Sequence, residues 1–507
     1  MQNSGPTSTS PSPARAPADE RAALLGLAIA LVTGAVVLFW RLTAQSPFLD
    51  EAFSVRIASQ DLPTLIQAVA RQDVHPPLFY LLAHFVVTWL HWPVQQYRLL
   101  TTPLSMFTIF ATWAIARRCF GATAAFVAAL VVALQPVMLP WDRLFRMYGV
   151  LVPAATASWL LLLKALDDSA GRRRTIWWIL YAVCAVALPY LQYLGAVVLV
   201  CQCGYALADL RKRWPVYAIA AASCASLLPW LWAIKLQYPL GGYTASTHPN
   251  IFDVFSGLAV LGAPAQWVHQ TWFSPAVGSV VIAVLIAGSM LGRSTLLPWW
   301  LLQIVLQVAA TLMLEKSLAI PRYLLTALPA VAIAIGAVTA ALIGSRLRLL
   351  GVGLAASFVV LEAVCVSNLL LDPYYQYPDW YLVRTFVGLH EARTDVMVFD
   401  QAFPGLVVEG YPEFAGHELY GPNTPRDVEP TIRLVDLRPA ARVWYIENQW
   451  WYPDPGHRIL RHLQTTRPLT RVWHEARFDP ANEVYVLLFG PAHRTAPGVR
   501  HITRKRV

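Results

Sequence analysis

The chain has 507 residues, of which 57% are apolar and only 13% are charged. A soluble domain usually carries about 25% charged residues, so this composition excludes an ordinary water-soluble protein. The formal net charge of +10 does not indicate nucleic-acid binding, because no basic segment interleaved with aromatic residues accompanies it. We expect instead a membrane protein whose positive charges gather on the cytoplasmic side.

The N-terminal segment is expected to be a tail followed by a retained membrane helix. Residues 1–21 are rich in Pro, Ser, Ala and Thr and lack an apolar period, which predicts a disordered cytoplasmic tail. The run 22–40 has no small-residue cleavage site, so a first transmembrane helix is favoured over a signal peptide. The six cysteines lie in or beside apolar runs, and their spacing indicates neither a C-terminal disulfide nor a metal site.

Further apolar runs follow the first one at short intervals. They fall near 76–92, 98–116, 120–140, 150–166, 176–190, 193–209, 215–235, 276–292, 296–314, 322–344 and 349–371. Because roughly 20 apolar residues span the hydrocarbon core of a bilayer, residues 22–371 are predicted to form a polytopic α-helical domain with about 11–12 transmembrane helices. Its first outer loop is expected over 43–97, with helices at the membrane interface.

Basic clusters in short loops set the expected orientation, because such clusters stay on the cytoplasmic side. The clusters are Arg172–Arg174, Arg211–Arg213 and the pair Arg346 and Arg348. They put the outer side at 141–149, 190–193, 236–275, 315–322 and all residues after 371. The run 76–92 would then begin and end outside, so we predict a re-entrant or interfacial segment, which leaves about eleven crossings. The alternative is an ordinary further crossing.

Residues 372–507 have the composition of a water-exposed, extracytoplasmic domain. Short β-type runs occur at 396–399, 443–446 and 484–488, and amphipathic helices are expected at 378–391 and 456–465. This alternation predicts a small α/β domain with a mainly parallel sheet. No glycine-rich phosphate loop opens a helix, so a nucleotide-binding domain is not indicated. For its aromatic residues we favour a core or interfacial role over sugar stacking; they are Trp444, Tyr445, Trp450, Trp451 and Tyr452.

An acidic pair, Asp50–Glu51, follows the first expected crossing. Two adjacent carboxylates at the end of a membrane helix are costly unless they face water, a cation or a substrate. The functional interpretation is a general base that deprotonates an acceptor as it attacks an anomeric carbon. The alternative is a pair of solvated loop charges. His75 precedes two prolines that suit a helix start, and it would either orient a substrate near Asp50 or be a capping or interfacial residue.

Arginines recur on the expected outer side, where positive charge is disfavoured. Arg143 and Arg146 lie in one outer segment, and Arg322 begins a late apolar run beside Tyr323. Such arginines need an anionic partner, and a phosphate group suits the planar guanidinium fork. For the first segment, Asp142 or lipid headgroups are the alternative partners.

Outer carboxylates, outer arginines and the lack of a nucleotide motif together favour a sugar donor that resides in the membrane. Nucleotide sugars are made in the cytoplasm, so a transferase at the outer face needs a lipid-bound activated sugar. The phosphate of a polyprenyl-phosphate sugar would leave with help from the arginines as charge develops. The expected partners are this donor, an unknown acceptor (lipid, glycan or protein) and membrane lipids, and no nucleic acid.

Four segments, in this order, resemble motifs of the membrane-embedded glycosyltransferases of the C superfamily. The likeness is greatest to family 39-type proteins, which are related to protein O-mannosyltransferases and lipid A aminoarabinose transferases. The segments are Asp50–Glu51, His75–Leu78, Arg146–Tyr148 and Arg322–Leu324. Residues 377–380 also resemble the Asp-Trp segment that often opens the outer domain of these proteins. The resemblance covers roughly residues 40–400.

The resemblance implies a C-type glycosyltransferase fold with Asp50 as catalytic base, and Glu51 would support it or contact the acceptor. The expected donor phosphate-binding residues are Arg146, Arg322, Tyr148 and Tyr323, together with Arg143. The family often has Glu-Ala before Arg-Met-Tyr, where this chain has Leu144–Phe145. Either Asp142 replaces this glutamate as a substrate-orienting residue, or the site differs from that of the family. Some members of the superfamily, the oligosaccharyltransferases, use a divalent metal, but the nearer relatives do not, so the resemblance implies no metal or other cofactor for this chain.

The sequence therefore predicts an inverting transfer of a monosaccharide from polyprenyl phosphate to an acceptor at the outer face of the cell (inner) membrane. The N-terminus would be cytoplasmic and the C-terminal domain extracytoplasmic. A polytopic lipid or sugar transporter, or flippase, is the rival class. It would carry several ionisable residues in mid-helix, where this chain has chiefly His84 and Glu362. A non-catalytic scaffold would need no carboxylate at position 50.

Overall fold

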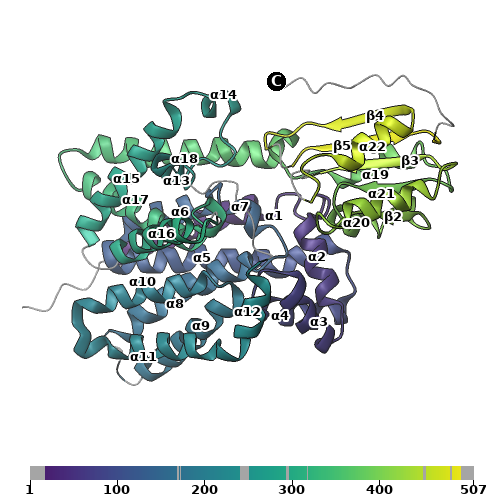
Figure 1. The fold of residues 1–507 in the computed structure, drawn as a ribbon. Coiled ribbons are helices and arrows are strands. Elements are labelled where there is room, and N and C mark those ends of the chain that lie inside the picture. The colour runs from purple at the N-terminus through teal and green to yellow at the C-terminus, as the bar shows by residue number, and fades with distance from the viewer. Residues whose placement is uncertain are drawn as a thin grey trace, which may run out of the picture.

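The chain forms a helical domain and a smaller α/β domain that lie side by side (Figure 1). This computed structural model describes residues 17–167, 171, 173–239, 250–292, 296–316, 318–448, 453–479 and 482–492. Most of the expected N-terminal tail lies outside the described residues. Its last residues, 17–21, already belong to helix α1 (Pro17–Phe39).

Apolar helices make up the larger domain. After α1 come α5 Arg98–Phe120, α6 Ala122–Ala133, α7 Leu139–Asp142, α8 Tyr148–Ala165, α9 Arg174–Leu191, α10 Gly195–Ala206, α11 Leu210–Ser226, α12 Leu231–Gln237, α13 Ile251–Ser256, α14 Ala265–Val268, α15 Phe273–Gly292, α16 Gln303–Leu314, α17 Leu328–Ile343 and α18 Arg348–Leu371. Among the described residues, eight helical segments are long and apolar enough to cross a membrane, and four shorter apolar helices accompany them. The chain is an integral membrane protein.

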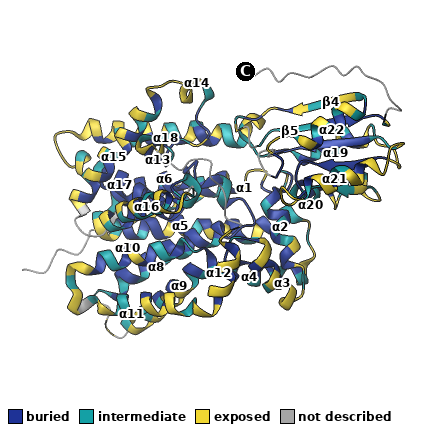
Figure 2. Cartoon of the chain, in the orientation of Figure 1, coloured by how far each residue is buried: buried dark blue, intermediate teal, exposed yellow. Residues whose placement is uncertain are grey.

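The most buried helices form the centre of the helical domain. The apolar windows of α17 and α8 are 78% and 72% buried, whereas that of α11–α12 is 22% buried. Gly336 of α17 lies so close to α6 that an added Cβ would come within 2.3 Å of the Ala124 carbonyl oxygen. Small residues permit such contacts between membrane helices. The peripheral helices keep exposed apolar faces, as lipid-facing helices do (Figure 2).

Three helices form the segment between the first two long apolar helices. They are α2 Leu49–Ala58, α3 Leu62–Gln72 and α4 Leu78–Leu90. Helix α4 corresponds to the run expected to be re-entrant or interfacial. Its 13 residues extend only about 20 Å, which is less than the roughly 30 Å of a bilayer core. This length favours the interfacial interpretation, and the position of α4 in the membrane stays a prediction.

The C-terminal domain is built on one five-stranded sheet in the order β2-β1-β3-β5-β4. Its strands are β1 Val396–Phe399, β2 Glu418–Tyr420, β3 Val443–Glu447, β4 Leu469–Glu475 and β5 Val484–Phe489. Strand β1 pairs in parallel with β2 and β3, but β5 runs antiparallel to β3 and β4. The expected mainly parallel sheet is therefore wrong: the sheet is mixed. The segment 476–483 is too short for a parallel crossover, which needs a dozen or more residues, so β4 and β5 form an antiparallel pair.

Helices cover both faces of this sheet. Helices α19 Trp380–Gly388 and α20 Phe403–Val408 pack on one face, and α21 Val428–Asp436 and α22 Arg458–Thr466 pack on the other. Helices α19 and α22 correspond to the two expected amphipathic helices. Trp444 and Tyr445 are buried in β3, which favours the core role for this part of the aromatic cluster. The other three members, at 450–452, lie outside the described residues.

Candidate active site

Helix α2 carries the acidic pair and lies between the two domains. Leu49 and Ala52 are buried in the same apolar cluster as Trp380 and Val383 of the C-terminal domain. The side of α2 that carries Glu51 and Ser54 faces arginines of the helical domain instead. The helix that holds the candidate base is therefore packed by both domains.

Glu51 is fully buried, and protein donors occupy both of its carboxylate oxygens. Oε1 accepts hydrogen bonds from Arg98 Nε at 2.8 Å and from the Phe145 backbone N–H at 2.8 Å. Oε2 accepts from Arg98 Nη2 and from the Phe48 backbone N–H at 3.0 Å. Arg98 also donates to the backbone carbonyls of the loop before α2, at Leu42, Gln45 and Ser46. The Glu51–Arg98 pair thus ties the start of α2 to α5.

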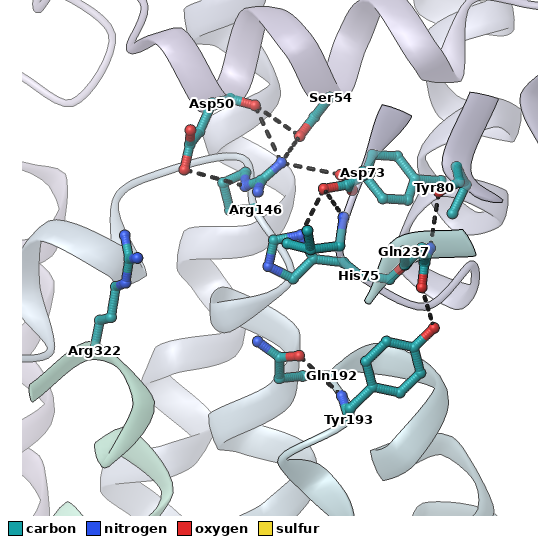
Figure 3. A network of polar contacts seen from close by, with 12 residues as sticks. Asp50, Ser54, Asp73, His75, Tyr80, Arg146, Gln192, Tyr193, Gln237 and Arg322 are labelled. Carbon is teal, nitrogen blue, oxygen red and sulfur yellow. Dashed lines mark hydrogen bonds and ion pairs between the residues drawn. The ribbon is translucent and has the colours of Figure 1, made fainter. Parts of the chain in front are cut away.

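Asp50 differs from its neighbour because 40% of its side chain is exposed. Its Oδ2 lies 3.7 Å from Nε of Arg146, which is almost completely buried. Nη1 of Arg146 donates to the Asp50 carbonyl oxygen at 3.3 Å, to Ser54 Oγ at 2.8 Å and to Tyr80 Oη at 3.1 Å (Figure 3). Arg146 is therefore held in place on the side of α2 that carries Asp50.

The hydrogen-bond network continues from Tyr80 to residues that the sequence did not single out. The Tyr80 hydroxyl donates to Asp73, and His75 Nδ1 lies 2.8 Å from Asp73 Oδ1. Burial would raise the pKa of Asp73, but His75, Arg146 and Tyr80 together hold it well below its usual value. Asp73 therefore stays ionised. Gln237 of α12 donates to the His75 carbonyl oxygen at 2.9 Å, which connects this network to a distant helix (Figure 3).

Arg322 approaches the same region from a short 3₁₀ turn, η6 Pro321–Tyr323. Its Cζ lies 4.9 Å from the ring centroid of Tyr323 and 6.0 Å from that of Trp141. In Figure 3 the side chain points toward the side on which Asp50 and Arg146 lie. Burial would lower the pKa of Arg322, but Tyr323, Tyr148 and Asp50 raise it above its usual value, so this guanidinium stays protonated.

The structure directs Arg143 and Asp142 away from this group. Arg143 donates to the Trp40 carbonyl oxygen near the end of α1, and burial lowers its pKa to about 10. Asp142 lines a small cavity with Ser105 of α5 and Gln135, and burial raises its pKa to about 7. Their expected phosphate-binding and substrate-orienting roles gain no support from this placement.

Comparisons with known proteins find a family and several solved structures to which this chain is similar. Residues 74–232 match the family of dolichyl-phosphate-mannose-protein mannosyltransferases. The solved structure of apo ArnT from Cupriavidus metallidurans aligns with a TM-score of 0.51 at 15% identity, covering 93% of this chain and 98% of ArnT. The oligosaccharyltransferase AglB from Archaeoglobus fulgidus aligns with a TM-score of 0.53 at 12% identity, covering 95% and 75%. No curated protein matches the sequence.

The chain therefore has the fold of ArnT and AglB, and part of it matches the mannosyltransferase family. The resemblance inferred from four short motifs and the expected fold class are both confirmed. The family match includes His75, Arg146 and Tyr148, whereas Asp50 and Arg322 lie outside the matched residues.

The sequence analysis missed several residues of this candidate site. Arg98, Ser54, Asp73, Tyr80 and Gln237 all make contacts that organise it. A signal existed for two of them. Arg98 is a cation at the expected outer end of an apolar run, and Asp73 lies two residues before His75. Within the described ranges, no group of three His, Cys, Asp or Glu residues is placed to hold a metal ion. Metal dependence was predicted to be absent and stays a prediction.

Proposed function

We propose that this protein is a glycosyltransferase that moves a monosaccharide from a polyprenyl-phosphate donor to an acceptor at the outer membrane face. The observation that carries the proposal is the grouping of a half-exposed carboxylate, Asp50, with two arginines from distant parts of the chain. A carboxylate can deprotonate the acceptor, and a cation can stabilise the phosphate as it leaves. The transfer requires both groups in one site.

Asp50 would act as the base in a single displacement. The acceptor hydroxyl or amine gives its proton to the Asp50 carboxylate as the acceptor atom forms a bond to the anomeric carbon. The bond between that carbon and the phosphate oxygen breaks, and its electron pair leaves with the phosphate. One displacement without a covalent intermediate inverts the anomeric configuration, by analogy with inverting glycosidases.

The two arginines are suited to different tasks. Arg146 is 3% exposed, and Ser54, Tyr80 and the Asp50 carbonyl already accept from its Nη1, so it positions Asp50. Arg322 is only partly buried and stands beside Tyr323, so it is the better partner for the donor phosphate. Tyr148 and Tyr323 would border the same phosphate. Glu51 is saturated by its donors and would position the helix rather than contact the acceptor.

Further observations support a lipid-linked donor and a site at the outer face of the membrane. AglB, which shares the fold, was solved in complex with an inhibitory peptide and a dolichol-phosphate. The basic clusters near Arg173, Arg211 and Arg346 favour a cytoplasmic side opposite to the site, with the N-terminus inside and the C-terminal domain outside. In a cell (inner) membrane, this arrangement requires a donor that crosses as a lipid.

Transfer by the purified protein in lipid nanodiscs tests the proposal. Polyprenyl phosphates carrying radiolabelled hexoses or pentoses are supplied with a membrane extract as the source of acceptor. Asp50→Asn should reduce transfer by about a hundredfold to ten-thousandfold, because it removes the base. Arg322→Ala should weaken binding of undecaprenyl phosphate by about tenfold or more, because it removes a charge-assisted contact.

Two variants serve as controls. Asp61→Asn changes an exposed carboxylate that caps α3 in the same segment, and Arg56→Ala changes an arginine with 56% side-chain exposure on α2. Both should transfer at wild-type rates. A wild-type protein that moves lipid across a liposome bilayer but never transfers sugar would refute the proposed enzyme activity. This result would support the transporter class instead.

A further inference from the structure

The segment that enters the C-terminal domain is fastened to the loop before α2. Ser46 Oγ donates to the Pro378 carbonyl oxygen at 3.1 Å and accepts from the Trp380 backbone N–H at 3.0 Å. Both hydrogen bonds are buried. The residue that precedes this clamp, Tyr377, is therefore held at a fixed place beside the loop that leads to Asp50.

Tyr377 belongs to a group of aromatic rings contributed by three separate segments. Its ring centroid lies 4.1 Å from that of Phe48 and 6.5 Å from that of Trp141. We call these three rings the aromatic wall. Trp141 also packs edge-on against Tyr148 at 5.2 Å and lies 6.0 Å from the Arg322 guanidinium carbon. The wall therefore extends from the start of α2 to the proposed phosphate-binding arginine.

The charges of the site act on the Tyr377 hydroxyl in opposite senses. Burial raises the pKa of Tyr377, the Asp50 carboxylate raises it further, and Arg322 acts in the opposite sense. The phenol is thus within the electrostatic reach of both groups. Within the described ranges, no hydrogen bond engages this hydroxyl. A donor sugar must lie between the base that activates its acceptor and the arginine that holds its phosphate.

We propose that Tyr377, with Phe48 and Trp141, forms a subsite for the monosaccharide ring of the donor. This inference rests on the proposed function and adds a specificity-determining residue to it. Aromatic faces suit the apolar C–H face of a sugar, and the phenol supplies a polar group for a sugar hydroxyl. Tyr377 lies at the start of the C-terminal domain, so that domain contributes directly to sugar recognition.

Binding of two lipid probes tests the subsite. The first probe is undecaprenyl phosphate, which has no sugar. The second is chosen from four sugar-lipids that share its lipid and phosphate: undecaprenyl-phosphate mannose, glucose, galactose and arabinose. The sugar-lipid that wild type binds most tightly is then compared with undecaprenyl phosphate for each variant in nanodiscs. Tyr377→Leu keeps an apolar side chain against Phe48 but removes the ring, and Tyr377→Phe keeps the ring but removes the hydroxyl.

We expect Tyr377→Leu to bind the sugar-lipid about tenfold more weakly, the effect of losing about 1.4 kcal/mol, and to bind undecaprenyl phosphate as wild type does. Tyr377→Phe should lose less. The matched control is Tyr374→Leu, because Tyr374 is 39% exposed and its ring contacts Tyr375 and Phe478. Binding of both probes by this control should be unchanged.

The subsite would be overturned if Tyr377→Leu weakened the binding of both probes equally, or weakened the binding of neither. If Tyr377→Leu does not fold, Tyr377→Phe and Trp141→Phe decide in the same comparison: wild-type preference for the sugar-lipid in both would overturn the subsite. If the wild-type protein transfers sugar and these variants bind both probes as wild type does, only this inference is refuted. A wild type that neither prefers any sugar-lipid nor transfers sugar refutes the proposed function as well.

Discussion

Asp50 and Glu51 are adjacent in sequence but have different surroundings. Successive residues of an α-helix point about 100° apart, so the two carboxylates of α2 face different neighbours. Glu51 faces the interior and pairs with Arg98, whereas Asp50 remains 40% exposed beside Arg146. Only an exposed carboxylate can reach an acceptor, so we propose Asp50 as the base and Glu51 as the residue that anchors α2.

Replacing Glu51 by Gln should destabilise the protein strongly with little change of shape. The substitution leaves the buried Arg98 guanidinium without its counter-ion, which typically costs about 3–5 kcal/mol. We expect a lower midpoint of thermal unfolding in detergent for Glu51→Gln than for wild type or Asp50→Asn. The double variant Glu51→Gln, Arg98→Met should recover part of the loss. A Glu51→Gln protein as stable as wild type would contradict the anchoring role.

At the scale of elements, α2 is held from two sides. Leu49 and Ala52 are each 4% exposed within the C-terminal core, and Phe53 contacts Phe403 of α20 with ring centroids 5.4 Å apart. The Glu51–Arg98 pair fixes the opposite side to α5. The C-terminal domain therefore contributes to the position of the proposed base as well as to the aromatic wall.

Truncating the C-terminal contact of α2 should reduce the rate of the chemical step. Leu49→Ala removes packing between α2 and the C-terminal core, and small displacements of a reacting group cost up to about a hundredfold in rate. We expect a lower kcat with unchanged binding of undecaprenyl phosphate, measured by transfer and lipid-binding assays. Leu62→Ala is the matched control, because Leu62 is 43% exposed on α3. Unchanged kcat in Leu49→Ala would show that α2 needs no support from this domain.

Some elements were predictable from the sequence because their environment leaves a local pattern. Strands β1 and β3 are buried along their whole length, so they appear as short apolar runs. Strand β4 is largely exposed and β2 has three residues, so neither has such a run. The direction of β5 depends on the short connection 476–483, which a search for apolar runs does not weigh.

The candidate site was predictable where a charged residue stands in an apolar context. Asp50, Arg146 and Arg322 stand out for this reason. Which of two neighbours faces the site is set by packing: Arg143 and Arg146 are three residues apart, yet one contacts the end of α1 and the other contacts α2. The contact between Asp73 and Tyr80 likewise depends on the turn between α3 and α4.

At the scale of the whole molecule, the site lies where the helical domain meets the C-terminal domain. The segments that build it are 46–54, 73–80, 141–148, 320–323 and 377–380. No single one of these segments contains both the proposed base and the proposed phosphate partner. The proposed chemistry therefore depends on which face of the membrane this junction occupies.

Labelling of single cysteines tests the orientation. The six native cysteines are replaced, and one cysteine is returned at Thr465 on α22 or at Ser345 between α17 and α18, both exposed. Helix α18 has 24 residues and extends about 36 Å, enough to cross a bilayer. A membrane-impermeant maleimide should label Thr465→Cys in right-side-out vesicles and label Ser345→Cys only after detergent treatment.

The expected difference follows from the charges that flank α18. Arg346 and Arg348 stand at its N-terminal end beside Ser345, and basic residues in short loops remain cytoplasmic. The chain that follows its other end carries Tyr377 and then the C-terminal domain. Labelling of Ser345→Cys alone from outside would put the Asp50 carboxylate on the cytoplasmic side. Nucleotide sugars would then be within reach, and the reason for a lipid-linked donor would disappear.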